Sequence, residues 1–201
     1  MENVLLHSCC APCSAAIIEW MLAHDILPTI YYYNPNIFPL EEYEKRKGEI
    51  TRYASSLGLN IIDGDWEHEA WRAMVRGLEN EPERGRRCQK CFDMRLESAA
   101  RKCAELGLKR FTTSLASSRW KSLEQVDAAG MRAQNLVPGV LYWAKNWRKD
   151  GLQERRSQLI RLNGFYNQQW CGCEFSHEAM IRWRARKVQD QQSADCTCGK
   201  N

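Results

Sequence analysis

Clustered cysteines are the residues of this chain most able to carry chemistry. The chain has 201 residues and 10 cysteines, and only Cys103 stands far from another cysteine. The others form four groups, which are Cys9-Cys10-Ala11-Pro12-Cys13, Cys88-Gln89-Lys90-Cys91, Cys171-Gly172-Cys173 and Cys196-Thr197-Cys198. A chain of this length buries enough apolar surface to fold without disulfides. Clustered thiols in such a chain indicate metal ligands or redox catalysts.

The first two groups together predict a metal site. Thiolates three or four positions apart on one turn can reach a common centre, and two such turns complete a shell of four thiolates. Both zinc and an iron–sulfur cluster accept four cysteine ligands. These groups offer five cysteines, one more than a closed zinc site needs, and the polar stretch before Cys88 does not resemble a compact zinc knuckle. Both features favour an iron–sulfur cluster, with structural zinc as the alternative.

The remaining cysteines differ in what they can do. Two thiols separated by one residue, such as Cys171 and Cys173, can form a strained disulfide that is easily reduced, which suits redox turnover. Two unrelated core thiols are the alternative. Cys103, alone within a predicted helix, is expected to be a small core side chain. Cys196 and Cys198 lie in a polar C-terminal segment and are expected to have no fixed role.

The cysteine groups need a fold that brings distant segments together, and the pattern of elements supplies one. We predict strands over residues 3–7, 28–33, 59–63, 110–114 and 140–143, and helices over residues 14–24, 40–57, 67–78, 92–106 and 122–135. This alternation predicts an α/β fold, a parallel sheet between two layers of helices. Ligands bind at the carboxyl ends of such strands. The segments expected to meet there are the first cysteine group, Asn34 with Asn36, and Thr112-Thr113-Ser114.

The charge distribution divides the chain into a catalytic body and a basic region. We predict an α/β catalytic domain over residues 1–143, a basic helical region of the same domain over 144–188 and a flexible tail over 189–201. The net charge of +4 comes from the C-terminal third, where residues 140–201 hold 11 Lys and Arg against 6 Asp and Glu.

Basic residues interleaved with tryptophans indicate an RNA-binding surface, with a solvated basic face as the alternative. Lysine and arginine neutralise phosphates, and aromatic rings stack on unpaired bases. The candidate residues are Lys145, Arg148, Arg155 and Arg156, with Trp143 and Trp147 among them, and Lys121 near a predicted helix N-terminus.

The sequence carries no targeting pattern. Its N-terminus lacks a basic segment followed by a long apolar run, so no secretory signal peptide is predicted. No apolar stretch reaches the roughly 20 residues that a membrane-spanning helix needs. We therefore expect a cytoplasmic protein without a membrane partner.

A series of motifs in one order makes the sequence specific. The motifs are Leu6-His7-Ser8-Cys9-Cys10-Ala11-Pro12-Cys13, Tyr33-Asn34-Pro35-Asn36-Ile37, Glu42-Tyr43 with Arg46, Arg87-Cys88-Gln89-Lys90-Cys91-Phe92 with Arg95-Leu96, Thr112-Thr113-Ser114-Leu115 with Ser118 and Lys121, and Phe165-Tyr166 with Gln168 and Cys171-Gly172-Cys173. Together they resemble the QueH family of epoxyqueuosine reductases, and the resemblance runs from about residue 3 to residue 178.

The resemblance implies a function and a fold. Members of the family catalyse the last step of queuosine synthesis, in which the epoxide of epoxyqueuosine at the wobble position of tRNA is reduced to the alkene without cobalamin. The implied fold is HUP-like, similar to the adenine nucleotide α-hydrolases. The glycine-rich phosphate loop of ATP-using relatives is absent from this sequence.

The resemblance also implies cofactors and partners. A [4Fe–4S] cluster would be held by Cys9, Cys10, Cys88 and Cys91. Cys13 would serve a second, mononuclear iron beside the cluster. The Cys-Gly-Cys motif would supply a redox-active disulfide between Cys171 and Cys173. The implied partners are tRNA, through its anticodon loop, and an electron donor that the sequence does not identify.

The chemistry of epoxide removal suits these residue types. The reaction takes two electrons and two protons, whereas a [4Fe–4S] cluster normally delivers one electron at a time, so a dithiol would help to store or pass the pair. A low-coordinate iron would act as a Lewis acid on the epoxide oxygen. The candidate proton donors are His7, Tyr33 and Tyr166, and for His7 the alternative is a strand-end histidine bonded to backbone. Two competing hypotheses remain, a zinc-stabilised RNA-binding protein without redox chemistry and a thiol–disulfide oxidoreductase.

Overall fold

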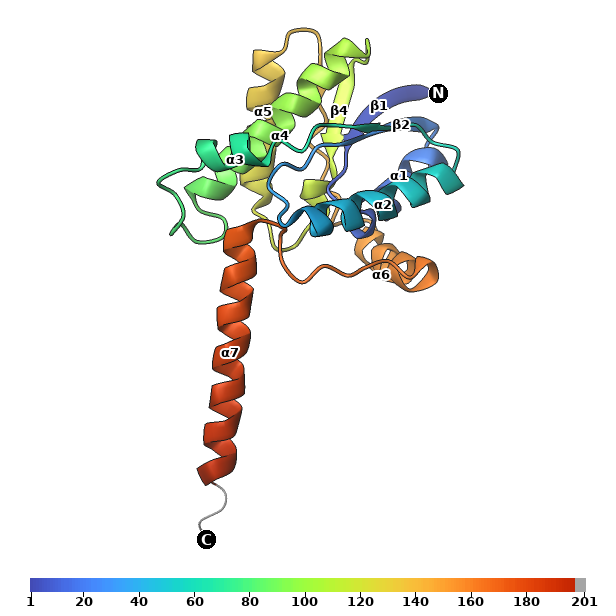
Figure 1. Ribbon diagram of the computed structural model, residues 1–201. Helices are drawn as coiled ribbons and strands as arrows, with labels where there is room; N and C mark the ends of the chain where they lie inside the picture. Colours follow the sequence, from blue (N-terminus) through green and yellow to red (C-terminus); the bar gives the residue numbers. More distant parts are fainter. Residues whose placement is uncertain (198–201) are drawn as a thin grey trace.

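The computed structural model describes residues 1–197, with the side chains of residues 1–187 and Gln189. It contains a sheet of five parallel strands with helices packed around it. Figure 1 shows how these elements are arranged. The strands are β1 Glu2–His7, β2 Ile26–Tyr32, β3 Ile61–Asp63, β4 Arg110–Thr113 and β5 Leu141–Tyr142. Their order in the sheet is β3-β2-β1-β4-β5. Because β1 pairs with both β2 and β4, the winding of the chain reverses between β1 and β4. Open parallel sheets bind their ligands at such a reversal point, beyond the carboxyl ends of the strands.

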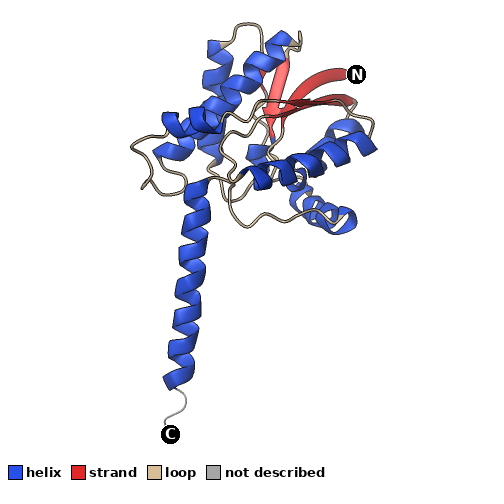
Figure 2. Cartoon of the chain, viewed as in Figure 1, coloured by secondary structure: helices blue, strands red, loops and turns tan. Residues whose placement is uncertain are grey.

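Helices cover both faces of the sheet (Figure 2). They are α1 Ala11–Ala23, α2 Leu40–Ser56, α3 His68–Met74, α4 Arg86–Glu105, α5 Leu123–Leu136, α6 Leu152–Asn163 and α7 Glu174–Thr197, with a 3₁₀ turn η1 at Ser114–Ser117. On one face α1 packs with α2 and α6, and on the other α4 packs with α5. The predicted α/β architecture, a parallel sheet between helical layers with a mostly helical C-terminal region, is therefore confirmed.

The core explains why β1 lies at the centre. Val4, Leu5 and Leu6 are fully buried, because helices cover both faces of the strand. A parallel strand in that position carries a continuous apolar run instead of an alternating pattern. The run ends at His7, where the chain turns and enters α1 through the first cysteine group. The central strand thus delivers three cysteines to the carboxyl edge of the sheet.

Two helices begin earlier than predicted, and both differences concern cysteines. Helix α1 begins at Ala11 instead of residue 14. Pro12 fits its first turn, because N–H groups in a first turn have no partner within the helix and proline has no N–H to satisfy. Helix α4 begins at Arg86 instead of residue 92. Residues 86–91 are mostly polar and have no apolar spacing, so the sequence does not mark them as helical. Cys13 and Cys88 consequently lie in the first turns of helices, and Cys91 lies one turn further along α4.

Helix α7 projects away from the body of the molecule (Figure 1). It runs to Thr197, so the segment predicted as a flexible tail from residue 189 continues as helix. Residues 198–201, including Cys198, lie outside the described residues, as does the side chain of Cys196. Within the described part of the chain, no helix combines the length and apolar character needed to span a bilayer.

Candidate metal and redox site

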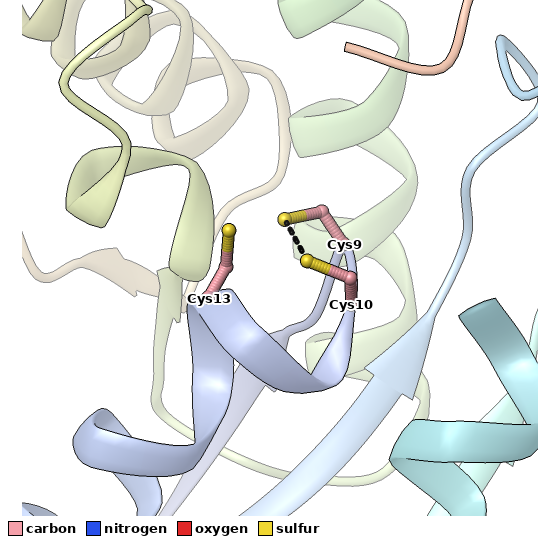
Figure 3. A group of neighbouring side chains, drawn as sticks. All are labelled: Cys9, Cys10 and Cys13. Atoms are coloured by element: carbon pink, nitrogen blue, oxygen red, sulfur yellow. Dashed lines mark hydrogen bonds between the residues drawn. The ribbon is translucent and has the colours of Figure 1, made fainter. Parts of the chain in front are cut away.

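Three cysteines form a compact cluster where β1 leads into α1. The sulfur atoms of Cys9, Cys10 and Cys13 all lie within 4.8 Å of one another, and the Cys9 and Cys10 sulfurs are 3.7 Å apart. Figure 3 shows the three side chains turned toward one another from the end of the strand and the first turn of the helix. Cys9 and Cys10 are buried, and Cys13 is half-buried. Converging thiols of this kind can hold a metal ion.

Helix N-termini favour negative charge at these cysteines. Cys10 is the N-cap residue of α1, and Cys13 is the third residue of that helix. Cys88 is likewise the third residue of α4, with Cys91 one turn further on. The free N–H groups and the macrodipole of a helix N-terminus stabilise anions, including thiolates. Two helices therefore present their positive ends to the cysteines that were predicted to bind metal.

Hydrogen bonds and a buried arginine concentrate negative charge on Cys9. The Cys9 N–H donates to Ser114 Oγ at 2.9 Å, and the Ser114 hydroxyl donates to Cys9 Sγ at 3.3 Å. Hydrogen bonds from Cys10 and Cys13, and then the charge of Arg95, lower the pKa of Cys9 well below its usual value. Burial raises the pKa of Cys10, whose thiol donates to Gln168 Oε1 at 3.2 Å.

Cys88 and Cys91 lie on α4, across the same cavity from the first group. Among the described residues, the compact sulfur group holds Cys9, Cys10 and Cys13, and the α4 cysteines lie outside it. Cys88 Sγ accepts the Arg84 N–H at 3.3 Å, and burial raises its pKa to about 11. The structure thus brings the two cysteine groups to one cavity, although they are far apart in sequence.

Cys171 and Cys173 lie side by side as free thiols. Their sulfurs are 3.5 Å apart, and the Ser176 hydroxyl lies 3.1 Å from Cys171 Sγ. The hydrogen bond with Cys173, and then the charge of Lys121, lower the pKa of Cys171 well below its usual value. The shared proton and burial raise the pKa of Cys173. The two neighbouring thiols thus differ in pKa, and the pKa of Cys171 is the lower one.

Arg46 fixes the loop that carries this pair. Its guanidinium donates to the carbonyl oxygens of Cys171 at 3.2 Å and Trp170 at 3.3 Å, while Glu42 holds its Nε at 2.7 Å. Gly172 adopts φ +113°, and a Cβ there would lie 2.9 Å from Ile37. The sequence by itself assigned no role to Arg46. Its place in the series of family motifs was the feature that could have indicated one.

The cysteine groups share one basic cavity of about 840 Å³. All seven cysteines of the first three groups line it. Seven Lys and Arg side chains line it against one acidic residue, Glu83. The basic residues are Arg46, Arg84, Arg87, Arg95, Lys121, Arg156 and Arg184. Such a cavity attracts a polyanion and stabilises thiolates.

His7 is held inside the fold, away from the cavity lining. Its Nε2 faces the Tyr33 carbonyl oxygen at 3.0 Å, so Nε2 carries the proton and Nδ1 accepts from the Thr113 hydroxyl at 2.8 Å. Burial, and then the charge of Arg95, lower its pKa to about 3. A neutral ring with both nitrogens engaged favours a structural role over the predicted role of proton donor.

The two candidate tyrosines also point to other partners. The Tyr33 hydroxyl donates to Glu67 at 2.5 Å, and burial raises its pKa. The Tyr166 hydroxyl donates to Glu42 at 3.2 Å. Neither side chain lines the cavity, whereas Gln168, two residues after Tyr166, does. The geometry therefore gives no support to either tyrosine as a direct proton donor.

The predicted RNA-binding residues separate into two sets. Lys121 and Arg156 line the cavity. Arg148 donates to the carbonyl oxygens of Ala116 at 3.2 Å and Lys121 at 2.9 Å, so it supports the loop after β4. Of the five predicted residues, only Lys121 and Arg156 are lining residues of the cavity.

Lys145 and Arg155 are engaged within the protein. Lys145 Nζ lies 4.2 Å from the centre of the Trp20 ring, and Arg155 forms a two-pronged ion pair with Glu19 at 2.6 and 2.9 Å. The interleaved tryptophans are engaged as well. Trp147 is fully buried and donates to Thr112 Oγ1 at 3.1 Å, and the Trp143 ring lies 5.2 Å from it. The structure contradicts the prediction that these two rings stack on RNA bases, because the tertiary fold packs them against each other.

A buried arginine, to which the sequence by itself assigned no role, joins the two cysteine groups through Asn34. Arg95, one turn after Cys91 on α4, donates to Asn34 Oδ1. Asn34 in turn donates to the Ser8 carbonyl oxygen at 2.9 Å, next to Cys9. This chain links α4 to the end of β1 and so holds the two cysteine groups in a fixed relation. Asn34 was expected at this edge of the sheet from its place after a predicted strand, whereas for Arg95 motif membership was the signal in the sequence.

The fold and the site together define a class of protein. It is a parallel α/β protein with a basic cavity whose clustered thiols can bind a metal. The chain belongs to the epoxyqueuosine reductase QueH family, whose model matches residues 4–179. The family predicted from the motifs is thereby confirmed, and with it an oxidoreductase.

Curated relatives agree across most of the chain. An epoxyqueuosine reductase QueH from Acinetobacter baylyi is 44% identical over 190 residues, which cover 94% of this chain and 87% of the relative. One from Haemophilus influenzae is 46% identical over 91% of this chain and 75% of the relative. One from Thermotoga maritima is 33% identical over 88% of this chain and 91% of the relative.

A solved structure supports the fold alone. A predicted subunit of a tRNA methyltransferase from Methanocaldococcus jannaschii superposes with a TM-score of 0.53 at 14% sequence identity. The match covers 78% of this chain and 75% of the other.

Proposed function

We propose that this protein reduces the epoxide of epoxyqueuosine in tRNA to the alkene of queuosine. The observation that carries the proposal is the convergence of seven cysteines from three distant segments on one basic cavity. Thiols supply redox and metal chemistry, and the basic lining suits an RNA substrate. Family membership supplies the substrate and the reaction class.

The donor set fits an iron–sulfur cluster. Cys9, Cys10, Cys88 and Cys91 would hold a [4Fe–4S] cluster, and Cys13 would serve a second iron. Sulfur-only donors near two helix N-termini suit iron–sulfur clusters and zinc, and a fifth cysteine exceeds what a closed zinc site takes. When bound, these metals would supply single-electron transfer and Lewis acidity toward the epoxide oxygen.

The Cys171–Cys173 pair would supply the electrons and protons that the reaction consumes. Reduction of the epoxide breaks both C–O bonds, forms the C=C bond and consumes two electrons and two protons, with water as the second product. Oxidation of the dithiol to a disulfide releases two electrons and two protons. The pair would therefore match one turnover, and an external electron donor would reduce the disulfide again.

Basic residues at the cavity would hold the RNA. Lys121 and Arg156 are half-buried cations that line it. Contacts of this kind with phosphates position the nucleic acid without reading its sequence. Because the target nucleotide belongs to a single-stranded loop, turning its base into the cavity costs little.

The experiment is nucleoside analysis of tRNA carrying epoxyqueuosine after anaerobic incubation with the protein and a chemical reductant. We expect conversion to queuosine by the wild type and by Cys103→Ser, whose thiol is buried in the core. Cys173→Ser should lose multiple turnovers. Unchanged epoxyqueuosine with wild-type protein of full iron content would contradict the proposal.

The zinc alternative is separated by the metal itself. Anaerobically purified protein that holds an iron–sulfur cluster is brown, whereas a zinc protein is colourless. Stoichiometric zinc in colourless protein that binds RNA would favour a zinc-stabilised RNA-binding protein.

A further inference from the structure

Two exposed tryptophans border the cavity from different elements. Trp120, between η1 and α5, is 79% exposed, and Trp183, on α7, is 56% exposed. Both are lining residues of the cavity that holds the cysteines. Tryptophan is highly buried on average in folded proteins, so two such exposed rings at one cavity need an explanation.

The other tryptophans of the chain have structural positions. They are Trp20, Trp66, Trp71, Trp143, Trp147 and Trp170, and each is buried or half-buried. Trp147 and Trp66 also use their indole N–H in hydrogen bonds to the protein. Trp71 and Trp170 also reach the cavity, but they are packed into the fold, so Trp120 and Trp183 are the two tryptophans that are both exposed and at the cavity.

The backbone around Trp120 is held while its ring stays exposed. The Arg84 side chain donates to the carbonyl oxygens of Trp120 at 3.0 Å and Arg119 at 3.2 Å. Arg84 itself lines the cavity, and its own N–H contacts Cys88. The loop is thus tied to the start of α4, which carries two cysteines. A fixed backbone with an exposed ring is suited to a stacking surface.

Trp183 is placed by the helix that projects from the body. Lys187 Nζ lies 4.4 Å from the centre of its ring, and Arg184 beside it lines the cavity. A cation near an exposed aromatic ring combines attraction for phosphate with a face for stacking.

We infer that Trp120 and Trp183 stack on unpaired bases that flank the nucleotide entering the cavity. The inference rests on the proposed function and adds how the RNA loop is held. Single-stranded RNA is recognised by stacking of its bases on aromatic rings, with cations beside the backbone. The cationic neighbours Arg84, Lys121 and Arg184 favour a nucleic acid over an apolar protein surface as the occupant.

The test compares RNA binding by matched variants of the full chain. The probes are an anticodon stem-loop with an unpaired loop and a fully paired duplex of equal length, both fluorescently labelled. The variants are Trp120→Ala, Trp183→Ala, the double change and the conservative Trp→Phe versions. Leu162→Ala is the control, because Leu162 is 73% exposed on α6 and does not line the cavity.

We expect each alanine variant to bind the stem-loop about tenfold more weakly, since loss of one stacked base costs this order of affinity. The phenylalanine variants should recover most of the binding, duplex binding should stay unchanged, and Leu162→Ala should match the wild type. Thermal unfolding should confirm that all variants fold, because both rings are exposed.

Three results would overturn the inference. They are equal stem-loop binding by the double alanine variant and the wild type, equal losses for the stem-loop and the duplex, and phenylalanine variants as weak as the alanine ones. Failure of the wild type to bind the stem-loop at all would instead count against the proposed function.

Discussion

Cys10 illustrates how position gives a single residue its chemistry. It ends the turn after β1, caps α1 and is almost fully buried, so its thiol meets two other sulfurs and the Gln168 side chain. Cys103 is equally buried, but its thiol donates to the carbonyl oxygens of Leu108 and Arg110 in the core. Two buried cysteines of one chain thus have different surroundings, since the Cys10 thiol lies among other sulfurs and the Cys103 thiol among backbone carbonyls.

This contrast predicts the effect on bound metal. Cys10→Ala should lower the iron bound per chain below that of the wild type, because it removes one sulfur from the converging group. Cys103→Ala should bind as much iron as the wild type. The measurement is iron and sulfide content, with the visible spectrum, after anaerobic reconstitution. Equal iron in both variants would contradict a metal site at Cys10.

Two neighbouring arginines on α6 also differ in their surroundings. Arg156 lines the cavity, whereas Arg155 pairs with Glu19 on α1. We expect Arg156→Ala to weaken tRNA binding and to reduce the slope of log K against log salt by about one, since one phosphate contact is lost.

Arg155→Ala is the matched control for this prediction. It should leave the salt slope unchanged, because Arg155 is engaged by the carboxylate of Glu19. The measurement is a titration of tRNA binding at several salt concentrations. A larger change of slope for Arg155→Ala than for Arg156→Ala would mean that the RNA lies over α6 instead of at the cavity.

At the scale of elements, short connections do the positioning. The loop before α7 places Cys171 and Cys173 at the cavity, and Arg46 on α2 and the Phe38 N–H hold it through its carbonyl oxygens. The N-terminal turns of α1 and α4 place the metal-binding candidates. Helix ends and loops, not helix centres, carry the chemistry.

Gly172→Ala should destabilise this loop. Its φ of +113° and the close approach of Ile37 leave no room for a Cβ, so we expect a loss of about 1–3 kcal/mol in the free energy of unfolding. Gly48→Ala is the control, because nothing lies within 4 Å of a Cβ in the middle of α2. That change should stabilise the protein by about 0.5–1 kcal/mol.

Chemical denaturation of the two glycine variants measures both effects. Alkylation of Cys171 and Cys173 in the native protein gives a second readout, since a loosened loop exposes its thiols. A Gly172→Ala variant as stable as Gly48→Ala would show that the loop does not require the left-handed conformation.

At the scale of the whole molecule, stability resides in the α/β body. Trp71 is almost fully buried and packs with Val75, Cys91 and Cys173 beneath the cavity. By contrast, α7 extends away from the body beyond its first turns (Figure 1). The molecule thus joins a packed catalytic body to a projecting helix.

Because α7 projects away from the body, shortening the chain after residue 187 should change the free energy of unfolding by less than about 0.5 kcal/mol (Figure 1). Trp71→Ala should cost about 3–5 kcal/mol, because it leaves a large cavity in the core. Both are measured by denaturation in urea. A shortened chain as unstable as Trp71→Ala would show that the end of α7 packs on the body.

The sequence alone determined the fold class and the family, and it predicted the chemical character of the site. Alternating elements predict a parallel sheet, and the spacing of thiols predicts metal and redox chemistry, because both depend on local periodicity and residue type. The sequence did not predict that helices begin at Ala11 and Arg86. Their first turns are polar or contain proline, so they lack the regular apolar spacing that indicates a helix.

Only the tertiary structure decided which side chains face the cavity. The sequence predicted that Trp143 and Trp147 stack on bases, yet the two rings pack on each other. Trp120 and Trp183 border the cavity instead. His7 is a buried residue whose two ring nitrogens both have hydrogen-bond partners. Arg155 and Arg156 are neighbours on α6, yet Arg155 pairs with Glu19 and Arg156 lines the cavity. Burial and direction depend on contacts between segments far apart in sequence, which residue type and spacing do not specify.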